Sequence, residues 1–242
     1  MRISHVTGAG SGIGAATARL LHDRGDAVVC ADLDGPRVAD VARDLDRATA
    51  VECDVTDQDA VDRMIDTALT EYGDLDAVVA CAGIEVPADT LDLDIELFRH
   101  IVDVNLTGSF LTAQRAARAM RDRGHGGAVV LIGSLNSQAA LPRAAPYCAS
   151  KGGVLMLGRA LALDLAAYGI RVNVIGPGVT DTPMSAESLA DEVASAALLD
   201  RIPLRRPARP GEIASAAAFL TSEDASYITG AFVPVDGGWL AN

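Results

Sequence analysis

Short apolar runs alternate with longer segments of helical periodicity along the whole chain. The runs are rich in Val and Ile and apolar throughout, as is typical of parallel strands that helices cover on both faces. No shift in composition, linker or repeat separates them. We therefore expect residues 1–242 to form one α/β domain, a doubly wound parallel sheet with helices on both faces. The expected strands are a stretch ending at Thr7, AVVCAD ending at Asp32, and residues 77–80, 128–132, 171–175 and 232–235.

The composition and net charge of the chain limit which molecules it is expected to bind. Half of the 242 residues are apolar, which suffices for one large core, and the net charge of −13 argues against nucleic acid and anionic membranes. No apolar stretch is long enough to span a bilayer, and the first strand starts too early to leave room for a signal peptide. The four cysteines form no C-x-x-C pair, and the four histidines show no ligand spacing. We expect a cytoplasmic protein with reduced thiols and no metal.

A glycine-rich loop joins the first strand to the first helix. Residues 7–14 read TGAGSGIG, and a helix-compatible run follows as far as Gly25. A strand, a glycine turn and a helix form the arrangement in which backbone N–H groups bind a pyrophosphate, whereas such a loop elsewhere would be an ordinary turn. The spacing is G-x-x-x-G-x-G, because Ile13 stands where G-x-G-x-x-G would carry its last glycine. The pattern predicts a Rossmann-type dinucleotide site built from Gly8, Ser11, Gly12, Ile13 and Gly14.

Asp32 ends the second strand, eighteen residues after Gly14. A carboxylate at this point of a dinucleotide-binding fold accepts hydrogen bonds from the adenosine ribose, although it could instead be a solvated loop aspartate. A 2′-phosphate ~5 Å away would be repelled by about 3 kcal/mol per unit charge at an effective dielectric of ~20. Neither Ser11 nor Leu33 is basic. The sequence therefore favours NAD over NADP as cofactor.

Tyr147 and Lys151 are four residues apart, and Ser134 lies thirteen residues upstream of the tyrosine. Residues four apart share a helix face, so the ammonium would lie close to the phenol. Bringing a tyrosine pKa from ~10 to neutrality requires roughly 4 kcal/mol, about what a unit charge at ~4 Å supplies at a dielectric of ~20. Alone, such a pair is often an ordinary helix contact. Together with the nucleotide-binding loop, the pair predicts a general acid/base that works at neutral pH. Ser134 would hold the oxygen whose proton moves.

The chain resembles the short-chain dehydrogenase/reductase family over nearly its whole length, and its motifs occur in the family's order. They are TGAGSGIG (7–14), CDV (53–55), VNLTGSF (104–110), GS (133–134), YCASK (147–151), GPGVTDTPM (176–184) and GGW (237–239). The resemblance implies that Tyr147 exchanges the proton, that Ser134 hydrogen-bonds the substrate oxygen and that Lys151 lowers the tyrosine pKa. It also implies that Lys151 binds the nicotinamide ribose and that Asn105 holds a water connecting Lys151 to solvent.

The same resemblance implies the remaining cofactor contacts. Asp54 and Val55 would contact adenine, and Val179 and Thr182 the nicotinamide carboxamide. The full expected cofactor set is Gly8, Ser11, Gly12, Ile13, Gly14, Asp32, Leu33, Asp54, Val55, Ala82, Gly83, Tyr147, Lys151, Pro177, Gly178, Val179 and Thr182. The chain departs from the family where N-N-A-G is common, since it has Ala80, Cys81, Ala82 and Gly83. This departure puts the stability of the sheet centre in doubt more than the chemistry.

The expected activity is NAD-dependent interconversion of a secondary alcohol and its ketone by hydride transfer. One alternative is an NADPH-dependent 3-oxoacyl carrier-protein reductase, which Asp32 and the acidic composition disfavour. Another is a non-catalytic NAD-binding regulator, which the complete Ser–Tyr–Lys set disfavours. Fold-level resemblance fixes chemistry better than substrate.

The expected substrate is a neutral, mainly apolar small molecule. The resemblance implies that the pocket walls come from residues just past Gly83, from residues 135–142 and from the stretch after Pro183. These segments contain Glu85, Asn136, Gln138 and Met184, and residues of about 184–200 are expected to form a mobile lid. These segments carry acids but no lysine or arginine, so a buried anion would lack a partner unless Arg143 turned inward. A homotetramer is also expected, with interfaces from residues 95–121 and 147–168 and from the last helix and strand. The small residues after Gly211 (IASAAAFL) would pack on a symmetry mate, or alternatively on their own sheet.

Overall fold

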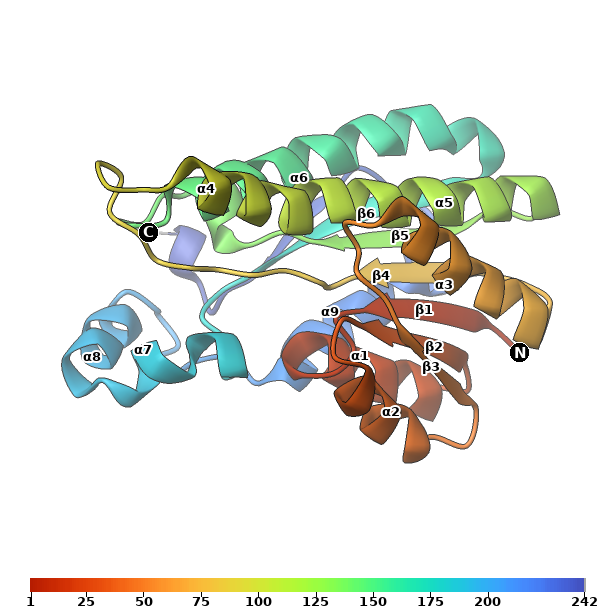
Figure 1. Cartoon of the computed structure of the whole chain (residues 1–242), viewed down its shortest axis with the longest axis horizontal. Helices are drawn as coiled ribbons and strands as arrows, with labels where there is room; N and C mark the ends of the chain where they lie inside the picture. The colour runs from red at the N-terminus through yellow and green to blue at the C-terminus, as the bar shows by residue number, and fades with distance from the viewer. Residues whose placement is uncertain (242) are drawn as a thin grey trace.

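The computed structural model describes residues 1–241. In that part of the chain seven parallel strands form one sheet in the order β3-β2-β1-β4-β5-β6-β7 (Figure 1). From β1 the chain adds β2 and β3 toward one edge, and it then returns to add β4 to β7 toward the other edge, as in a doubly wound fold. The expected sheet is therefore confirmed. The strands are β1 Ile3–Thr7, β2 Ala27–Asp32, β3 Ala48–Glu52, β4 Ala77–Ala80, β5 Gly127–Ile132, β6 Ile170–Pro177 and β7 Phe232–Val235.

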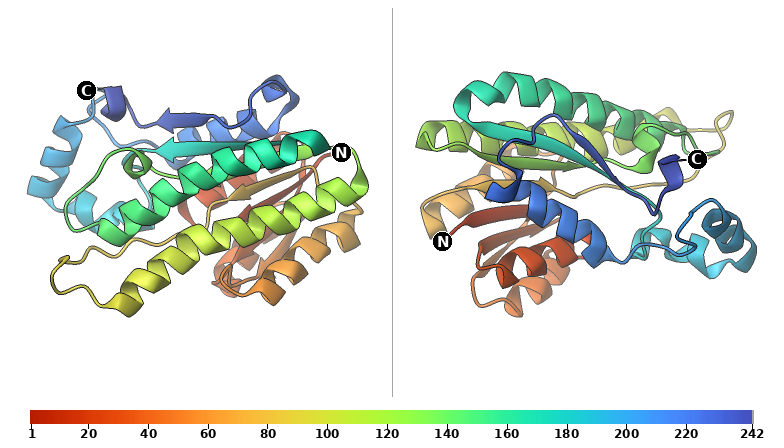
Figure 2. Two further views of the ribbon diagram at one scale, coloured as in Figure 1. Left: turned by 90° about the horizontal axis from the view of Figure 1, so that it is seen from above. Right: turned by 180° about the vertical axis from the view of Figure 1, so that it is seen from behind.

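Helices cover both faces of the sheet. One face packs against α3, α5 and α6, and the other against α1, α2 and α9, which gives the three layers seen in Figure 1 and, from two further directions, in Figure 2. The helices are α1 Gly12–Asp23, α2 Gly35–Arg43, α3 Gln58–Tyr72, α4 Ile95–Val102, α5 Gly108–Arg123, α6 Ala145–Leu165, α7 Ala186–Ala190, α8 Glu192–Asp200 and α9 Pro210–Thr221.

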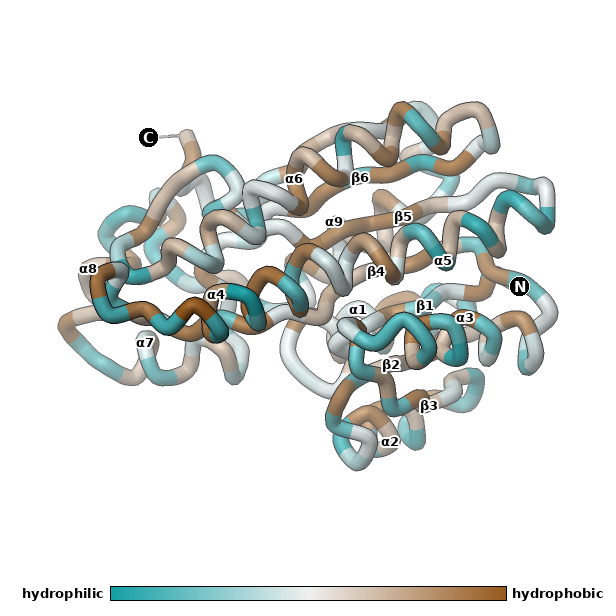
Figure 3. The backbone as a smooth tube through the Cα atoms, turned by 45° about the horizontal axis from the view of Figure 1, so that its top comes forward, coloured by the Kyte–Doolittle hydropathy of each residue, from teal (hydrophilic) through white to brown (hydrophobic). Residues whose placement is uncertain are grey.

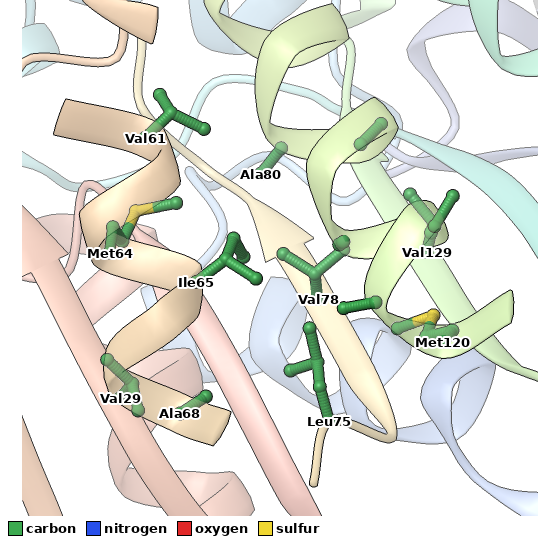
Figure 4. Close-up of a cluster of buried hydrophobic side chains, with 14 of the residues drawn as sticks. Val29, Val61, Met64, Ile65, Ala68, Leu75, Val78, Ala80, Met120 and Val129 are labelled. Atoms are coloured by element: carbon green, nitrogen blue, oxygen red, sulfur yellow. The ribbon is translucent and has the colours of Figure 1, made fainter. Parts of the chain in front are cut away.

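The core follows from strands that are apolar on both faces. Val78 of β4 is fully buried between Met64 and Ile65 of α3 and Met120 of α5, and both helices cover the same face of the sheet (Figure 4). Figure 3 shows apolar colour along the strands and hydrophilic colour on the outer turns of α3 and α5. Burying side chains of this size stabilises the fold by about 1.5–3 kcal/mol each. The carboxyl ends of the strands are thereby held at fixed positions.

Local chemistry sets the ends of the helices. Aspartates N-cap four of them by accepting from backbone N–H groups of the first turn, and glycines with positive φ end three segments. The aspartates are Asp34, Asp57, Asp94 and Asp191, and the glycines are Gly73, Gly124 and Gly169.

Two elements differ from the expectations. Strand β3 was not expected, because ATAVE is short, lies at the sheet edge and is only partly buried, so its apolar signal is weak. Asn105 lies in a π-helical turn over Asp103–Thr107 that joins α4 to α5, and no helix type was expected there. Such turns are frequent at functional sites.

The segment from Pro183 to Asp200 projects from the end of the sheet at which the strands terminate (Figure 1). It consists of a short 3₁₀ turn followed by α7 and α8. Within residues 1–241, no helix combines the length and apolar character that crossing a bilayer requires.

Candidate active site

A cleft of about 600 Å³ opens at the carboxyl ends of the central strands. Twelve of the seventeen expected cofactor residues line it, whereas Tyr147, Lys151, Pro177, Gly178 and Val179 do not. Val179 instead packs near a small apolar cluster formed by Leu135, Ile202 and Trp239. The twelve are Gly8, Ser11, Gly12, Ile13, Gly14, Asp32, Leu33, Asp54, Val55, Ala82, Gly83 and Thr182.

The glycine loop can only be built from glycine at its critical points. A Cβ on Gly14 would lie 2.0 Å from the carbonyl oxygen of Gly8, and one on Gly8 would lie 2.9 Å from the amide nitrogen of Ala82. Gly12 has a φ of 51°, in the left-handed region that favours glycine. No side chain caps the N-terminus of α1, and its first turn holds no acid. The loop therefore leaves backbone donors free for an anion such as a pyrophosphate.

Asp32 is held at the end of β2 by two backbone hydrogen bonds. Its Oδ2 accepts from the amide of Gly10 at 2.9 Å, and its Oδ1 accepts from that of Asp34 at 2.9 Å. Each carboxylate oxygen can accept a further hydrogen bond. Asp32 is thus fixed in orientation and faces the cleft as a carboxylate with acceptor capacity left.

Ser134 begins a short 3₁₀ turn after β5, and Asn136 holds its hydroxyl from two sides. The Ser134 Oγ accepts from the Asn136 amide nitrogen at 3.1 Å and donates to Asn136 Oδ1 at 3.2 Å. The Nδ2 of Asn136 donates to the Ala139 carbonyl at 3.2 Å. The side-chain amide of Asn136 is thus engaged within the protein, and the expected place of this residue beside the substrate stays a prediction.

Tyr147 and Lys151 lie on the first turns of α6 and are both buried. The Lys151 Nζ lies 5.6 Å from the centre of the tyrosine ring and donates to the Ile132 carbonyl at 2.9 Å. Burial lowers the pKa of Lys151 to about 8. Burial also raises the pKa of Tyr147, and the carboxylate of Glu85 adds to the rise, while the Ser134 hydroxyl opposes it.

The direction of the Tyr147 pKa is a correction to the sequence-based expectation. The charge argument predicted a lowered value, but desolvation of the phenolate outweighs it in this structure. Tyr147 is consequently protonated at neutral pH in the described state.

Asn105 locks the chain segment that follows β4. Its Oδ1 accepts from the Ile84 amide at 2.8 Å, and its Nδ2 donates to the Ile84 carbonyl at 2.9 Å and to the Ser150 hydroxyl at 3.0 Å. A Cβ on Gly83 would lie 3.2 Å from Asn105 Oδ1 and 3.4 Å from Lys151 Nζ. The asparagine therefore ties α6 to the loop past Gly83, a role additional to the water-holding one that the resemblance implied.

The other expected substrate residues are distributed around the mouth of the site. Glu85 is partly buried, and burial raises the pKa of its carboxyl, opposed by the Lys151 ammonium. Met184 lines the cleft and is 50% exposed. Gln138 is exposed. Arg143 is exposed too, with a φ of 61°, and its carbonyl accepts from the Ala88 amide at 2.9 Å.

Thr7 hydrogen-bonds the segment in which this chain lacks the two asparagines that are common in the family. Thr7 Oγ1 accepts from the amides of Cys81 at 3.1 Å and of Ala82 at 3.2 Å, so β1 and the segment after β4 remain joined. Ala80 is 2% exposed and completes β4. The threonine before the glycine loop could have been recognised as the partner from its place at the end of a neighbouring strand.

Some lining residues were not expected. Asp34, Cys53 and Ile84 follow or precede expected residues directly in the chain, so their proximity could have been inferred. Val104, which directly precedes Asn105 in the VNLTGSF motif, also lines the cleft. His100 lines it from α4, and no sequence signal indicated this histidine.

His125 lies beside two acids, although the histidines were expected to stand apart from potential ligands. It forms a 2.8 Å contact with Asp74, and Asp76 completes a group whose oxygen and nitrogen atoms lie within 4.8 Å of one another. Arg123 Nε is 3.4 Å from the same Asp74 carboxylate, and the hydrogen bond to Asp74 raises the pKa of His125. Ion pairing accounts for this cluster.

Comparisons with known proteins agree with this geometry. A family model described as enoyl-(acyl carrier protein) reductase matches residues 8–240. The chain is 45% identical to a cis-4-hydroxycyclohexanecarboxylate dehydrogenase of Sinomonas cyclohexanicum over 99% of this chain and 97% of that protein. It is 41% identical to the 3beta-hydroxysteroid dehydrogenase 1 of Eggerthella lenta over 96% and 91%.

A solved structure carries the same fold. A short-chain type dehydrogenase/reductase from Mycobacterium marinum superposes with a TM-score of 0.94 at 37% identity, covering 100% of this chain and 96% of that one. The two relatives are named as dehydrogenases of compounds that carry a hydroxyl group. This chain belongs to the short-chain dehydrogenase/reductase family and is an oxidoreductase.

Proposed function

We propose that the protein is an NAD-dependent oxidoreductase that interconverts a neutral, mainly apolar secondary alcohol and its ketone, with Tyr147 as the acid/base. The observation that carries the proposal is the convergence of four buried side chains next to the nucleotide-sized cleft. They come from three separate segments of the chain, and packing and hydrogen bonds hold each in place: Asn105, Ser134, Tyr147 and Lys151.

The glycine loop fits a pyrophosphate, because Gly8 and Gly14 let the loop pack closely against neighbouring backbone and no side chain caps the backbone donors at the start of α1. Asp32 would accept from the adenosine ribose, and Asp54 and Val55 would lie beside the adenine. When bound, the nicotinamide supplies the acceptor or donor for hydride transfer. The chain's own residues must then position the alcohol carbon and move the hydroxyl proton.

Tyr147 would perform that proton movement. In ketone reduction its phenol gives a proton to the substrate oxygen, and in alcohol oxidation its phenolate takes that proton away. Ser134, whose orientation Asn136 fixes, would contact the same oxygen. The Lys151 ammonium, 5.6 Å from the ring centre, would favour the phenolate. The raised pKa of Tyr147 suits the role of proton donor at neutral pH and predicts that oxidation accelerates as pH rises.

NAD is proposed over NADP because of the charge of Asp32. The carboxylate is already oriented by Gly10 and Asp34 toward the cleft, so a 2′-phosphate would meet a fixed negative charge. We expect a preference of at least about a hundredfold in kcat/KM, equivalent to ~2.7 kcal/mol. Equal kcat/KM values for the two cofactors would contradict this assignment.

The neutral substrate is proposed because anions find no partner near the acid/base. Glu85 faces Tyr147 and Lys151, and Arg143 is exposed. The Eggerthella lenta relative is named for a hydroxysteroid, whereas the Sinomonas cyclohexanicum relative is named for a carboxylate. A cyclohexanecarboxylate places its charge away from a 4-hydroxyl group, so neither relative is named for a substrate with a charge beside the reacting carbon. The lid of α7 and α8 would cover the apolar end of the substrate.

A homotetramer is also proposed. Met156 and Leu163 on α6 are 59% and 82% exposed, and Phe219 and Tyr227 near the last helix and strand are 41% and 103% exposed, as apolar interface residues would be in an isolated chain. The alanines of α9, expected to meet a symmetry mate, instead pack inward with α1 residues: Ala214, Ala217 and Ala218 are buried. Light scattering at micromolar concentration should give about four times the 25.0 kDa chain mass.

The test is an activity screen with NAD followed at the cofactor absorbance. Cyclohexanol and cis-4-hydroxycyclohexanecarboxylate form a matched pair that differs by the remote carboxylate. We expect oxidation of cyclohexanol and of larger neutral ring alcohols. Oxidation of the carboxylate with little activity on cyclohexanol would contradict the neutral-substrate proposal while leaving the reaction class intact.

A carrier-protein reductase is the second candidate, because the matching family model is described by an acyl-carrier-protein activity. Asp32 and a net charge of −13 disfavour it, since the proposed cofactor is NAD and acidic carriers bind basic surfaces. NADPH-dependent reduction of a 3-oxoacyl thioester that exceeds ketone reduction with NADH would favour it over the first candidate.

A further inference from the structure

Arg37 is a cation beside the adenosine end of the cleft, although it does not line the cleft itself. It sits in the first turn of α2, shortly after the wall formed by Asp32, Leu33 and Asp34. A Cβ at Gly10 would lie 3.0 Å from Asp32 Oδ2 and 3.3 Å from Arg37 Cβ. The arginine and the ribose-binding carboxylate thus border the same point of the glycine loop.

Asp34 holds the arginine in its present position. The Arg37 Nε lies 3.2 Å from Asp34 Oδ2, and the Arg37 amide donates to Asp34 Oδ1 at 3.0 Å. The two side chains are 63% and 46% exposed, and exposed ion pairs of this kind contribute little. The guanidinium can therefore leave Asp34 for a stronger acceptor at small energetic loss, and its long side chain lets it move without displacing α2.

A phosphate is such an acceptor. Guanidinium groups bind phosphate oxygens through two parallel hydrogen bonds, which are stronger than those to a single exposed carboxylate oxygen. On the proposed cofactor site, the ribose 2′ position lies at Asp32. A 2′-phosphate would therefore be bordered by the Asp32 carboxylate, which repels it, and by Arg37, which attracts it.

We propose that Arg37 is a specificity-determining residue for the adenosine end of the cofactor: freed from Asp34, it binds a 2′-phosphate and limits the discrimination that Asp32 imposes against NADP. The proposal rests on the assignment of the cleft as the NAD site. Asp34 acts with Asp32, because it withdraws the cation from the cleft as well as adding negative charge. Sequence reasoning missed this residue, since Arg37 is five positions past Asp32 and only the start of α2 brings it back to Gly10.

The test compares the binding of two nucleotides that differ by the 2′-phosphate alone. Affinities for 5′-AMP and for 2′,5′-ADP are measured by isothermal titration calorimetry on the full chain and on the variants Arg37→Gln, Arg37→Lys, Asp34→Asn and the double variant Asp34→Asn/Arg37→Gln. Asparagine caps a helix about as well as aspartate, so Asp34→Asn removes the charge and keeps α2. An Asp32→Ser background repeats the series where 2′,5′-ADP binds more tightly.

Arg37→Gln should weaken 2′,5′-ADP binding about tenfold and change 5′-AMP binding by less than twofold. Asp34→Asn should strengthen 2′,5′-ADP binding severalfold, and most of that gain should vanish in the double variant, because it depends on the released arginine. Arg37→Lys should retain part of the effect. The kcat/KM values for NADP should follow the same order.

Two results separate the possible failures. In the first, Asp32→Ser strengthens 2′,5′-ADP binding but Arg37→Gln leaves it unchanged in both backgrounds, or Asp34→Asn gives the same gain with and without Arg37. Either outcome would show that the role given to Arg37 is wrong, while the site assignment stands. If 5′-AMP does not compete with NAD and Asp32→Ser changes no affinity, the assignment of the site is wrong, and the role of Arg37 falls with it.

Discussion

The stability of this protein should depend on pH through one buried histidine. His5 lies in the middle of β1 and is fully buried. Its Nε2 contacts the Met64 carbonyl at 3.2 Å, whereas its Nδ1 has no hydrogen-bond partner. Burial lowers the pKa of His5 from 6.5 to about 4. The folded state therefore holds His5 neutral, and the unfolded chain binds its proton first as the pH falls.

The sign and size of the effect follow from linkage. Above pH 6.5 the histidine is neutral in both states and adds no pH dependence. Between pH 6.5 and 4 the unfolded state is protonated and the folded state is not, so stability falls by about 1.4 kcal/mol per pH unit. The total loss over the interval from 6.5 to about 4 is about 3 kcal/mol, a large part of the stability of an ordinary domain.

The test substitution is His5→Leu. It replaces the imidazole with an apolar side chain of similar size among the surrounding aliphatic residues. The Met64 carbonyl keeps its hydrogen bond within α3 when the imidazole is removed. We therefore expect the free energy of unfolding to change by no more than about 1 kcal/mol at pH 7.5. Urea denaturation of both proteins at pH 7.5, 6.5, 5.5 and 4.5, at one fixed protein concentration, gives the difference in unfolding free energy. That difference should move in favour of the variant by about 2.5 kcal/mol across the series, which ends above the folded pKa. A constant difference would refute the burial argument, because the other titrating groups are common to both chains.

Three further results are expected at the site. Lys151→Ala should lower kcat and weaken NAD binding together, since the ammonium serves both the phenolate and the ribose; an unchanged Kd for NAD would remove the second role. Glu85→Gln should shift the pH profile of alcohol oxidation to lower pH, because the Glu85 charge raises the pKa of Tyr147, and an unmoved profile would show that the charge does not reach the phenol. Gly14→Ala should abolish NAD binding, since its Cβ would lie 2.0 Å from the Gly8 carbonyl, whereas Gly211→Ala, with no neighbour within 4 Å, should be neutral; equal affinities would contradict the loop geometry.

The sheet could be predicted from the sequence because parallel strands covered on both faces read as apolar runs. β2, β4 and β7 were expected with the bounds the structure gives, and the glycine loop fell at the end of β1. The edge strand β3 could not be predicted in this way, since it is only partly buried and its pattern is weak. The π-helical turn around Asn105 has no signature in spacing.

The electrostatics of the site were beyond the sequence. Spacing placed Lys151 one turn from Tyr147 correctly, but the balance between an attracting charge and the loss of water depends on how deeply the fold buries the phenol. The pocket was expected near Asn136, but the sequence did not indicate that a turn of three residues directs its amide oxygen to the Ser134 hydroxyl. Distances across the chain, such as that between Gly10 and Arg37, also require the tertiary structure.

The central claim is that the Tyr147 phenol carries the transferred proton. The most direct measurement is kcat for oxidation of cyclohexanol, or of the best neutral secondary alcohol from the screen, by Tyr147→Phe, together with the Kd for NAD by calorimetry. The substitution removes one oxygen and its proton and leaves the buried ring in place. We predict that turnover falls to background while the Kd for NAD changes by less than about threefold. A variant that keeps kcat within tenfold of the unmodified enzyme would show that another group moves the proton.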